Sequence, residues 1–279
     1  MEWRRAKTIL IIALLLTNCV LIGLFIQQKK NEEAMINRKI EFSNEVKDIL
    51  MQNDIEVLCE IPINELLMKV VTVTYEGYNG EKIAERIFPE YIVSQTENGP
   101  IYEAKDAVLS VSNGKQISYE RYGLSDKKLD DLEMAKKYAD EFIDKMGLES
   151  GDSRLTYHSI NNDGIKLIYS KVYKDIVLEK CVMEFEIDNL GVRKFYRYWL
   201  MPLGEVEGTR NIRSASKALL NLLGNEDAVG NNVIEIVPAF YFNPNLLSES
   251  GVEKTKKAQA ILSWRIQLDN GKVFFVEEY

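Results

Sequence analysis

Residues 125–147 read SDKKLDDLEMAKKYADEFIDKMG, and this stretch indicates how the body of the chain folds. Apolar residues recur at helical spacing from Leu129 to Met146. Ser125 is placed to cap the start of this helix, and Gly147 stands where a C-terminal cap belongs. Four runs with strand character follow, at about 154–160, 165–174, 176–188 and 191–201. The pattern predicts a helix packed on one face of an antiparallel meander.

A similar succession is expected near the end of the chain. A helix over about 212–223 ends at Gly224 and is followed by strands at about 232–242, 259–268 and 272–278. Asn270-Gly271 supplies the tight turn of the last hairpin. We therefore expect a C-terminal ectodomain over 125–279 made of two helix-plus-meander units, 125–203 and 210–279. The predicted fold class is α+β, with antiparallel sheets and packed helices.

A smaller N-terminal α+β ectodomain is expected over 45–124. Residues 66–75 predict a strand that closes at a turn at Asn79-Gly80. Further strands are expected at about 101–104, 107–112 and 115–120, with Asn113-Gly114 as the turn of a hairpin. An amphipathic stalk over 27–44 leads into this domain, because Ile36 and Ile40 continue a helical apolar pattern through a charged stretch.

Residues 8–26 read TILIIALLLTNCVLIGLFI, an uncharged run that matches the hydrocarbon core of a bilayer, about 30 Å thick. The run is longer than a secretory h-region and lacks small residues at its end, so we expect an uncleaved transmembrane helix. Residues 1–7 form the predicted cytoplasmic tail, with the body outside the cell membrane. Lipidation at Cys19 is a weaker alternative, since Asn18 is a poor residue before the cysteine.

Ala13, Thr17 and Asn18 are the candidate contacts with a partner helix in the membrane. An asparagine amide near the bilayer centre is costly unless it finds a partner, and small residues permit close helix approach. The alternative is that Thr17 bonds back to Ala13 within its own helix and that Asn18 is tolerated.

Charge and composition exclude several classes of function. Residues 1–30 carry a net +4 and the remaining 249 residues a net −12, which makes nucleic acid and other polyanions poor ligands of the body. His158 is the only histidine, so no multi-histidine metal site exists. The nucleotide-binding and serine-hydrolase glycine motifs are absent. We expect no enzyme activity, cofactor, metal or small-molecule substrate.

Three smaller features leave alternatives open. His158 reads as a solvated strand residue rather than a base. Cys59 and Cys181 are either buried free thiols or a disulfide. Two aromatic series could line a sugar or peptide groove or belong to the sheet core. They are Phe195, Tyr196, Tyr198 and Trp199, and Phe240, Tyr241 and Phe242.

Distinctive segments stand at both ends of the chain. They are MEWRRAKTI at 1–9 before a single span, IRSASKAL at 212–219, the strand at 236–241 and SWRIQLDNG at 263–271. In these segments the chain resembles the YycI family of membrane-anchored regulators. The resemblance covers the whole chain in organisation, whereas residues 31–125 match only in layout.

The resemblance implies a low-GC Gram-positive source and a two-component system regulatory protein. Such a protein acts with its relative YycH on the sensor histidine kinase WalK (YycG), which controls cell-wall homeostasis. The implied mode is non-catalytic, through transmembrane and ectodomain contacts that bias the kinase between states. Whether the kinase is inhibited or activated, the stoichiometry and any ectodomain ligand stay open. The alternative function is an anchored extracytoplasmic module, reminiscent of PepSY domains, that binds a peptide or inhibits a protease.

Overall fold

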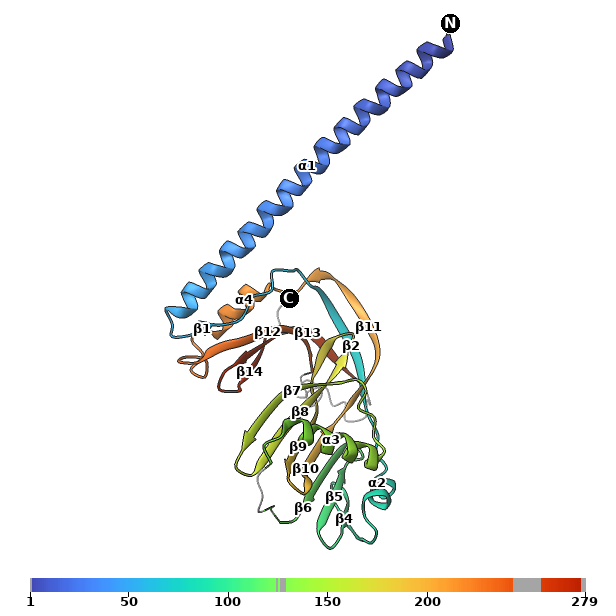
Figure 1. Cartoon of the computed structure of the whole chain (residues 1–279), viewed down its shortest axis with the longest axis vertical. Helices are drawn as coiled ribbons and strands as arrows, with labels where there is room; N and C mark the ends of the chain where they lie inside the picture. Colours follow the sequence, from blue (N-terminus) through green and yellow to red (C-terminus); the bar gives the residue numbers. More distant parts are fainter. Residues whose placement is uncertain (1, 124, 126–128, 243–256, 277–279) are drawn as a thin grey trace. The chain divides into compact units, whose positions relative to one another are not determined.

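The computed structural model describes residues 2–123, 125, 129–242 and 257–276 (Figure 1). Contacts group the chain into two compact units, each assembled from distant segments. Unit 1 comprises residues 1–65, 213–236 and 266–274, and unit 2 comprises residues 66–212, 237–265 and 275–279. The fold class is α+β, as predicted.

Unit 1 is built around the end of a single long helix. Its elements are α1 (Glu2–Met51), β1 (Glu56–Val57), α4 (Ala215–Leu219), the 3-10 helix η1 (Leu220–Leu222) and the start of β12 (Asn232–Tyr241). The end of α1 packs on α4 and β1, where it buries Val46 and Leu50 completely. β1 pairs in parallel with β12 through Glu56 and Val57.

The expected stalk is part of α1, which runs without a break from the apolar run into unit 1 (Figure 1). The stalk's apolar stripe is only partly used. Ile36 and Ile40 remain 45% and 44% exposed, and Met35 is 57% exposed. The middle of α1 therefore presents apolar side chains that nothing in the described chain covers.

Unit 2 is a twisted, mostly antiparallel sheet. Its elements are β2 (Leu67–Tyr75), α2 (Gly80–Ile87), β3 (Ile92–Thr96), β4 (Gly99–Glu103), β5 (Ala107–Ser112), β6 (Gln116–Arg121), α3 (Leu132–Met146), β7 (Ser153–Asn161), β8 (Gly164–Tyr173), β9 (Ile176–Asp188), β10 (Gly191–Tyr198) and β11 (Leu200–Asn211). Most of β13 (Lys257–Leu268) belongs to it, and β14 (Val273–Val276) follows β13.

The strand order is β11-β2-β13-β12-β9-β10-β6-β5-β4-β3, and β8 and β7 follow from β9. The predicted meander is confirmed in β7, β8, β9 and β10, which pair antiparallel in succession. The hairpin of β5 and β6 is also confirmed, and Asn113 and Gly114 have φ of 52° and 64°, as a tight turn requires.

α3 packs on β8, β9 and β10 through a face that includes Ala135, Ala139 and Ile143. The expected cap at Ser125 is wrong, because the helix begins at Leu132 and the carboxylate of Asp131 accepts the backbone N–H groups of Glu133 and Met134. The expected C-terminal cap is confirmed, since Gly147 is left-handed with φ 69°. Residues 126–128, within the expected helix, lie outside the described residues.

Asn79-Gly80 is not a hairpin turn. Asn79 caps α2, and its side-chain oxygen accepts the backbone N–H of Lys82 at 3.2 Å. A Cβ at Gly80 would lie 2.8 Å from the ring of Tyr102, so the helix start needs glycine. The short helix α2 and the strand β3 were not expected, because a turn signal and a capping signal share the same residue types.

Long-range pairing also differs from the prediction. β2 pairs with β11 and β13, which lie far along the chain, rather than with the strands of 92–121. β12 pairs in parallel with both β1 and β9, so the expected second unit is not an independent antiparallel meander. The expected strand 191–201 is divided at Trp199, and β11 extends to Asn211. The final strand is described as far as Val276, and residues 277–279 lie outside the described part.

Candidate interaction surfaces

α1 carries the candidate membrane span. It is the one helix among the described residues that is long and apolar enough to cross a bilayer, with a mean hydropathy of 2.9 in its most apolar window and no residue of that window buried. Residues 8–26 are helical throughout, as expected. Side chains on every side of this segment are free to contact lipid or another helix.

The structure brings two of the three candidate membrane contacts together. The hydroxyl of Thr17 donates a hydrogen bond of 2.8 Å to the backbone carbonyl of Ala13, so this hydroxyl is satisfied within its own helix. Within the described chain the amide of Asn18 has no hydrogen-bond partner and is exposed. Asn18 is therefore the polar group of the span that lacks an internal partner.

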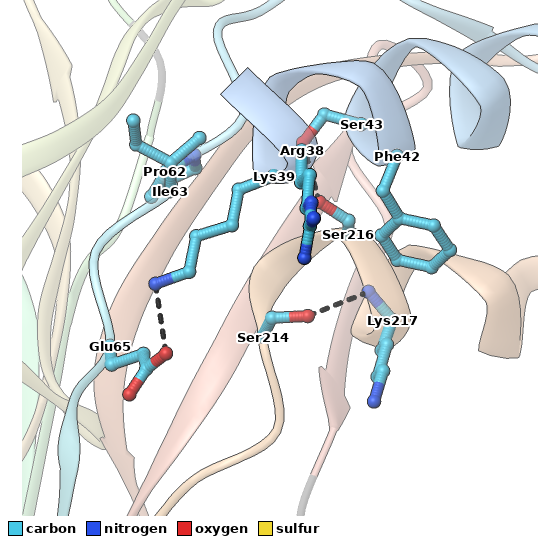
Figure 2. Close-up of a pocket in the computed structure, with 10 residues that line it drawn as sticks. All are labelled: Arg38, Lys39, Phe42, Ser43, Pro62, Ile63, Glu65, Ser214, Ser216 and Lys217. Atoms are coloured by element: carbon cyan, nitrogen blue, oxygen red, sulfur yellow. Dashed lines mark hydrogen bonds and ion pairs between the residues drawn. The ribbon is translucent and has the colours of Figure 1, made fainter. Parts of the chain in front are cut away.

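A pocket of about 290 Å³ lies in unit 1, where the end of α1 meets the segment before β2 and the start of α4 (Figure 2). We call it the stalk pocket. Its lining residues are Arg38, Lys39, Phe42, Ser43, Pro62, Ile63, Glu65, Ser214, Ser216 and Lys217. Apolar and cationic side chains thus share one opening. Sequence reasoning missed this site, because its lining comes from three segments that only the tertiary fold brings together.

Hydrogen bonds fix the wall of the stalk pocket. The hydroxyls of Ser43 and Ser216 lie 2.7 Å apart and join α1 to α4 in a buried contact. The hydroxyl of Ser214 accepts the backbone N–H of Lys217 and caps α4 (Figure 2). This cap was detectable in the sequence as a serine directly before Ala215, the first residue of the helix, although the expected helix started at 212.

The stalk pocket carries an excess of positive charge. Lys39 forms an ion pair of 2.8 Å with Glu65, and the hydrogen bond and charge of Lys39 lower the pKa of the Glu65 carboxyl (Figure 2). Arg38 and Lys217 are exposed, and no carboxylate of the described chain pairs with either. Two of the three cations at the pocket therefore remain available to an anionic group.

Unit 2 has an open groove of about 510 Å³ on its sheet. The lining residues are Gln116, Glu179, Lys180, Val182, Glu184, Tyr196, Tyr198 and Phe242. It lies where β9 changes its neighbour from β12 to β10, and Lys180 at this point has a left-handed backbone with φ 58°. Its carboxylates already have partners within unit 2, because Glu179 pairs with Arg265 at 2.8 Å and Glu184 with Lys166 at 2.9 Å.

Most of the aromatic candidates belong to the core. Phe195, Trp199, Phe240 and Phe242 are each at most 2% exposed. Tyr196 and Tyr198 are half-buried in the groove, and Tyr241 stacks on Phe275 with ring centroids 4.4 Å apart. The groove thus presents two tyrosines rather than a continuous aromatic platform.

A buried cation network lies inside unit 2. Arg197 is fully buried, and its guanidinium donates to Tyr78 Oη at 2.9 Å and to Glu76 Oε2 at 2.7 Å. Its carbon centre lies 4.5 Å from the ring centroid of Trp199. Burial raises the pKa of Tyr78, which keeps this phenol neutral, and its hydroxyl donates to Glu76.

Lys171 contacts the same ring. Its ammonium lies 5.1 Å from the centroid of Trp199 and forms an ion pair with Asp152, while its side chain is 2% exposed. The sequence contained a signal for the network, since strand period places Arg197 on the same face as the buried Phe195 and Trp199. Because each cation has an anionic partner, the network is internally satisfied and presents no open site.

The remaining candidates are solvated or inert. His158 is exposed on β7, as expected for a solvated strand residue. Cys59 and Cys181 are free thiols. Cys181 is buried, its sulfur accepts the backbone N–H of Leu200 at 3.0 Å, and burial raises its pKa to about 12. Among the described residues, no group of three or more His, Cys, Asp and Glu could hold a metal ion.

Comparison with known proteins gives distant structural likenesses. No protein-family model and no curated protein matches the sequence. Solved structures similar to this chain include YycH from Bacillus subtilis, with 13% identity and a TM-score of 0.49 over 75% of this chain and 53% of that chain. The chain therefore spans about half the length of the YycH structure.

Two further structures are similar to a lesser degree. An uncharacterized protein from Eubacterium rectale has 11% identity and a TM-score of 0.39, over 79% of this chain and 84% of that chain. The C-terminal domain of YpeB from Bacillus megaterium has 10% identity and a TM-score of 0.37, over 73% of this chain and 100% of that chain. Likenesses at this distance carry no argument about activity or partners.

Proposed function

We propose that this chain is a non-catalytic, membrane-anchored regulator of the two-component sensor histidine kinase WalK (YycG), acting together with a YycH-like protein in the control of cell-wall homeostasis. The observation that carries the proposal is the unbroken helix α1, which joins an apolar run of spanning length to a folded α+β body. The sequence resemblance to the YycI family at both ends of the chain supports the choice of partner.

The proposed mechanism needs only unequal binding to two states of the kinase. α1 provides a rigid connection for this purpose, because it is continuous from residue 2 to Met51 and its end is fixed in unit 1 by Val46, Leu50 and the contact of Ser43 with Ser216. A displacement of the span along or around its axis is therefore passed to the wall of the stalk pocket.

The proposed topology places the N-terminus in the cytoplasm and the body outside. Its support is the cationic tail directly before the span. In a variant whose natural cysteines are replaced, single cysteines at Glu33→Cys and near the C-terminus should react with a membrane-impermeant maleimide in intact cells. Labelling only after lysis would show that the body lies inside the cell and would contradict the proposed topology.

The span itself is proposed as part of the regulatory surface, through Ala13, Thr17 and Asn18. Interhelical polar contacts in membranes contribute about 0.6 to 2 kcal/mol, so the triple variant Ala13→Leu, Thr17→Leu and Asn18→Leu should weaken the complex several-fold without abolishing it. Leucine preserves hydrophobic length, so insertion should be unchanged. If the triple variant co-purifies with the kinase like the parent at equal membrane abundance, the span is only an anchor.

The proposal as a whole is tested by affinity purification of the full chain from detergent-solubilised membranes, with quantification of the captured proteins. We expect the histidine kinase and a YycH-like protein to be enriched. His158→Ala should be captured with the same partners and regulate like the parent, because an exposed strand residue contributes little to folding and the proposed mechanism uses no base. Capture of neither partner would contradict the proposal.

A second candidate function is an anchored extracytoplasmic module that binds a peptide or inhibits a protease, similar to PepSY domains. The groove of unit 2 favours it, because about 510 Å³ lined by Tyr196, Tyr198 and Lys180 suits a short peptide. Enrichment of a secreted protease or peptide in the same purification, in place of the kinase, would select this function.

A further inference from the structure

We propose that the stalk pocket, together with the exposed apolar side chains next to it on α1, binds the segment that adjoins the membrane span of a partner protein, and that this segment carries carboxylates flanked by apolar residues. The proposal rests on the membrane anchorage under the proposed function and adds the surface and the chemistry of the contact. Three properties of the pocket lead to it.

The first property is charge. Arg38 and Lys217 stand at the pocket without an anionic partner in the described chain, whereas Lys39 is already neutralised by Glu65. Residues 31–279 carry a net −12, so two open cations contrast with the rest of the body. A carboxylate placed between them would form charge-assisted hydrogen bonds, which are among the stronger polar contacts.

The second property is apolar surface. Phe42, Pro62 and Ile63 line the pocket beside the cations (Figure 2). One turn towards the span, Met35 lies on the same face of α1 as Arg38 and Lys39, because residues three and four apart are neighbours on a helix. Met35 and Ile36 are 57% and 45% exposed. The apolar surface therefore continues along α1 from the pocket towards the span. A partner segment that lies beside this helix would bury these side chains.

The third property is distance from the bilayer, which decides between a lipid and a protein. At 1.5 Å per residue, Arg38 lies about 18 Å beyond Ile26, the end of the apolar run. The headgroup layer extends only about 5 to 8 Å beyond the hydrocarbon core on each side. Lipid phosphates therefore do not reach the pocket on an upright helix. A segment that directly follows another protein's membrane span lies at the same distance from the bilayer as the pocket.

The site is also preformed. The buried contact of Ser43 with Ser216 and the cap of Ser214 on α4 hold the wall in place, so binding needs to order only the long side chains of Arg38 and Lys217. Membrane anchorage confines both partners to the same layer, which raises the effective concentration of the segment and lets a small contact suffice.

The test is binding of a fluorescent peptide to the full chain in nanodiscs of phosphatidylcholine, followed by anisotropy. The probe is a short helical peptide with glutamates and leucines on one face, and its matched control has glutamines in place of the glutamates. We expect the parent to bind the acidic peptide at least about tenfold more tightly than the glutamine peptide, as two charge-assisted contacts require.

Variants locate the binding. Arg38→Glu with Lys217→Glu should weaken the acidic peptide at least about tenfold. Lys82→Glu with Lys105→Glu makes the same change of charge at exposed positions of unit 2 and should bind like the parent. If the charge-reversed variant does not fold, Arg38→Gln with Lys217→Gln replaces it in the test. This variant should bind the acidic peptide and the glutamine peptide equally well.

Three results would overturn the proposal. The first is no binding of the acidic peptide to the parent, and the second is equal loss in the two charge-reversed variants. The third is displacement of the peptide when phosphatidylglycerol replaces part of the phosphatidylcholine, which would assign the pocket to an anionic headgroup. None of these measurements uses the kinase, so a parent that binds the peptide but captures no kinase would refute only the proposed function.

Discussion

Unit 1 and unit 2 hold their cations in opposite ways. Inside unit 2, Arg197 and Lys171 are almost completely buried, and each pairs with a carboxylate while both contact the ring of Trp199. At the stalk pocket of unit 1, Arg38 and Lys217 are exposed, and no carboxylate of the described residues pairs with either. Buried charges must be paired to be tolerated, whereas open cations at a pocket cost the fold little and remain available to a partner.

This contrast predicts that substitutions in the network of unit 2 affect folding, and that substitutions at the stalk pocket affect binding. Both kinds of substitution are measured on the full chain in detergent micelles.

The largest effect is expected for Arg197→Met. The substitution keeps the volume but leaves Tyr78 and Glu76 without their cationic partner, so the free energy of unfolding should fall by about 3 to 5 kcal/mol. Urea unfolding followed by tryptophan fluorescence measures it, since Trp199 lies directly against the guanidinium.

The matched control for this network is the double variant Arg197→Met with Glu76→Gln. Removing the charge of both partners should recover part of the lost stability, because no unpaired carboxylate remains beside the core. A loss within about 0.5 kcal/mol for Arg197→Met alone, as for an ordinary surface change, would contradict a structural role for the network.

Ser216→Ala comes next. It leaves the buried hydroxyl of Ser43 without its partner at 2.7 Å, which should cost about 1 to 3 kcal/mol. The double variant Ser43→Ala with Ser216→Ala removes both hydroxyls and should cost less than the single variant. Equal losses of free energy of unfolding in the two variants would mean that the contact between Ser43 and Ser216 does not stabilise the packing of α1 on α4.

Because of Cys181, the free energy of unfolding should fall at alkaline pH. Burial raises its pKa from 9.0 to about 12, so its contribution to the free energy of unfolding is complete below pH 9.0 and is lost as pH rises towards 12. Between pH 9.0 and 10.0 the loss should be about 1 kcal/mol. The buried tyrosines Tyr78 and Tyr198 each add a smaller loss, about 0.3 to 0.4 kcal/mol between the same two pH values, because burial raises their pKa from the ordinary 10.0.

Urea unfolding of Cys181→Ala at the two pH values checks this assignment. Between the two pH values the variant should lose about 1 kcal/mol less than the parent, while the dependence from the buried tyrosines remains. Cys59→Ala is the control, because Cys59 is only half-buried, and partial burial raises its pKa with the charge of Lys47 acting in the opposite direction. A pH dependence for Cys181→Ala parallel to that of the parent would place the titrating group elsewhere.

The smallest effect on folding is expected at the stalk pocket. Arg38→Glu with Lys217→Glu should change the free energy of unfolding by no more than about 0.5 kcal/mol, since both side chains are exposed and unpaired within the described chain. A large loss would show that these cations stabilise unit 1 and would remove the contrast with unit 2.

Local features of the fold were predictable from the sequence. The apolar run of α1, the cap at Gly147, the turn at Asn113-Gly114 and the meander of β7 to β10 follow from periodicity and turn chemistry. The start of α3 was misplaced because Ser125 and Asp131 both suit a cap, and only packing decides between them.

Features that depend on distant segments were not predictable in this way. β2 gives no sign that its neighbours are β11 and β13, because pairing across such separations is decided by the whole sheet. The stalk pocket was missed for the same reason, as Arg38, Glu65 and Lys217 become neighbours only in the folded unit 1. The alternation of Phe195, Arg197 and Trp199 on one face of the chain, in β10 and directly after it, was a usable signal for the buried network.

The central claim is that the chain biases a sensor histidine kinase by contact and without catalysis. The most direct measurement is the rate of autophosphorylation of the purified kinase in nanodiscs, with and without the full chain in the same disc. We predict that the parent changes this rate, and that the triple variant Ala13→Leu, Thr17→Leu and Asn18→Leu changes it less. A rate that is the same with and without the parent, while both proteins occupy the same disc, would contradict the account.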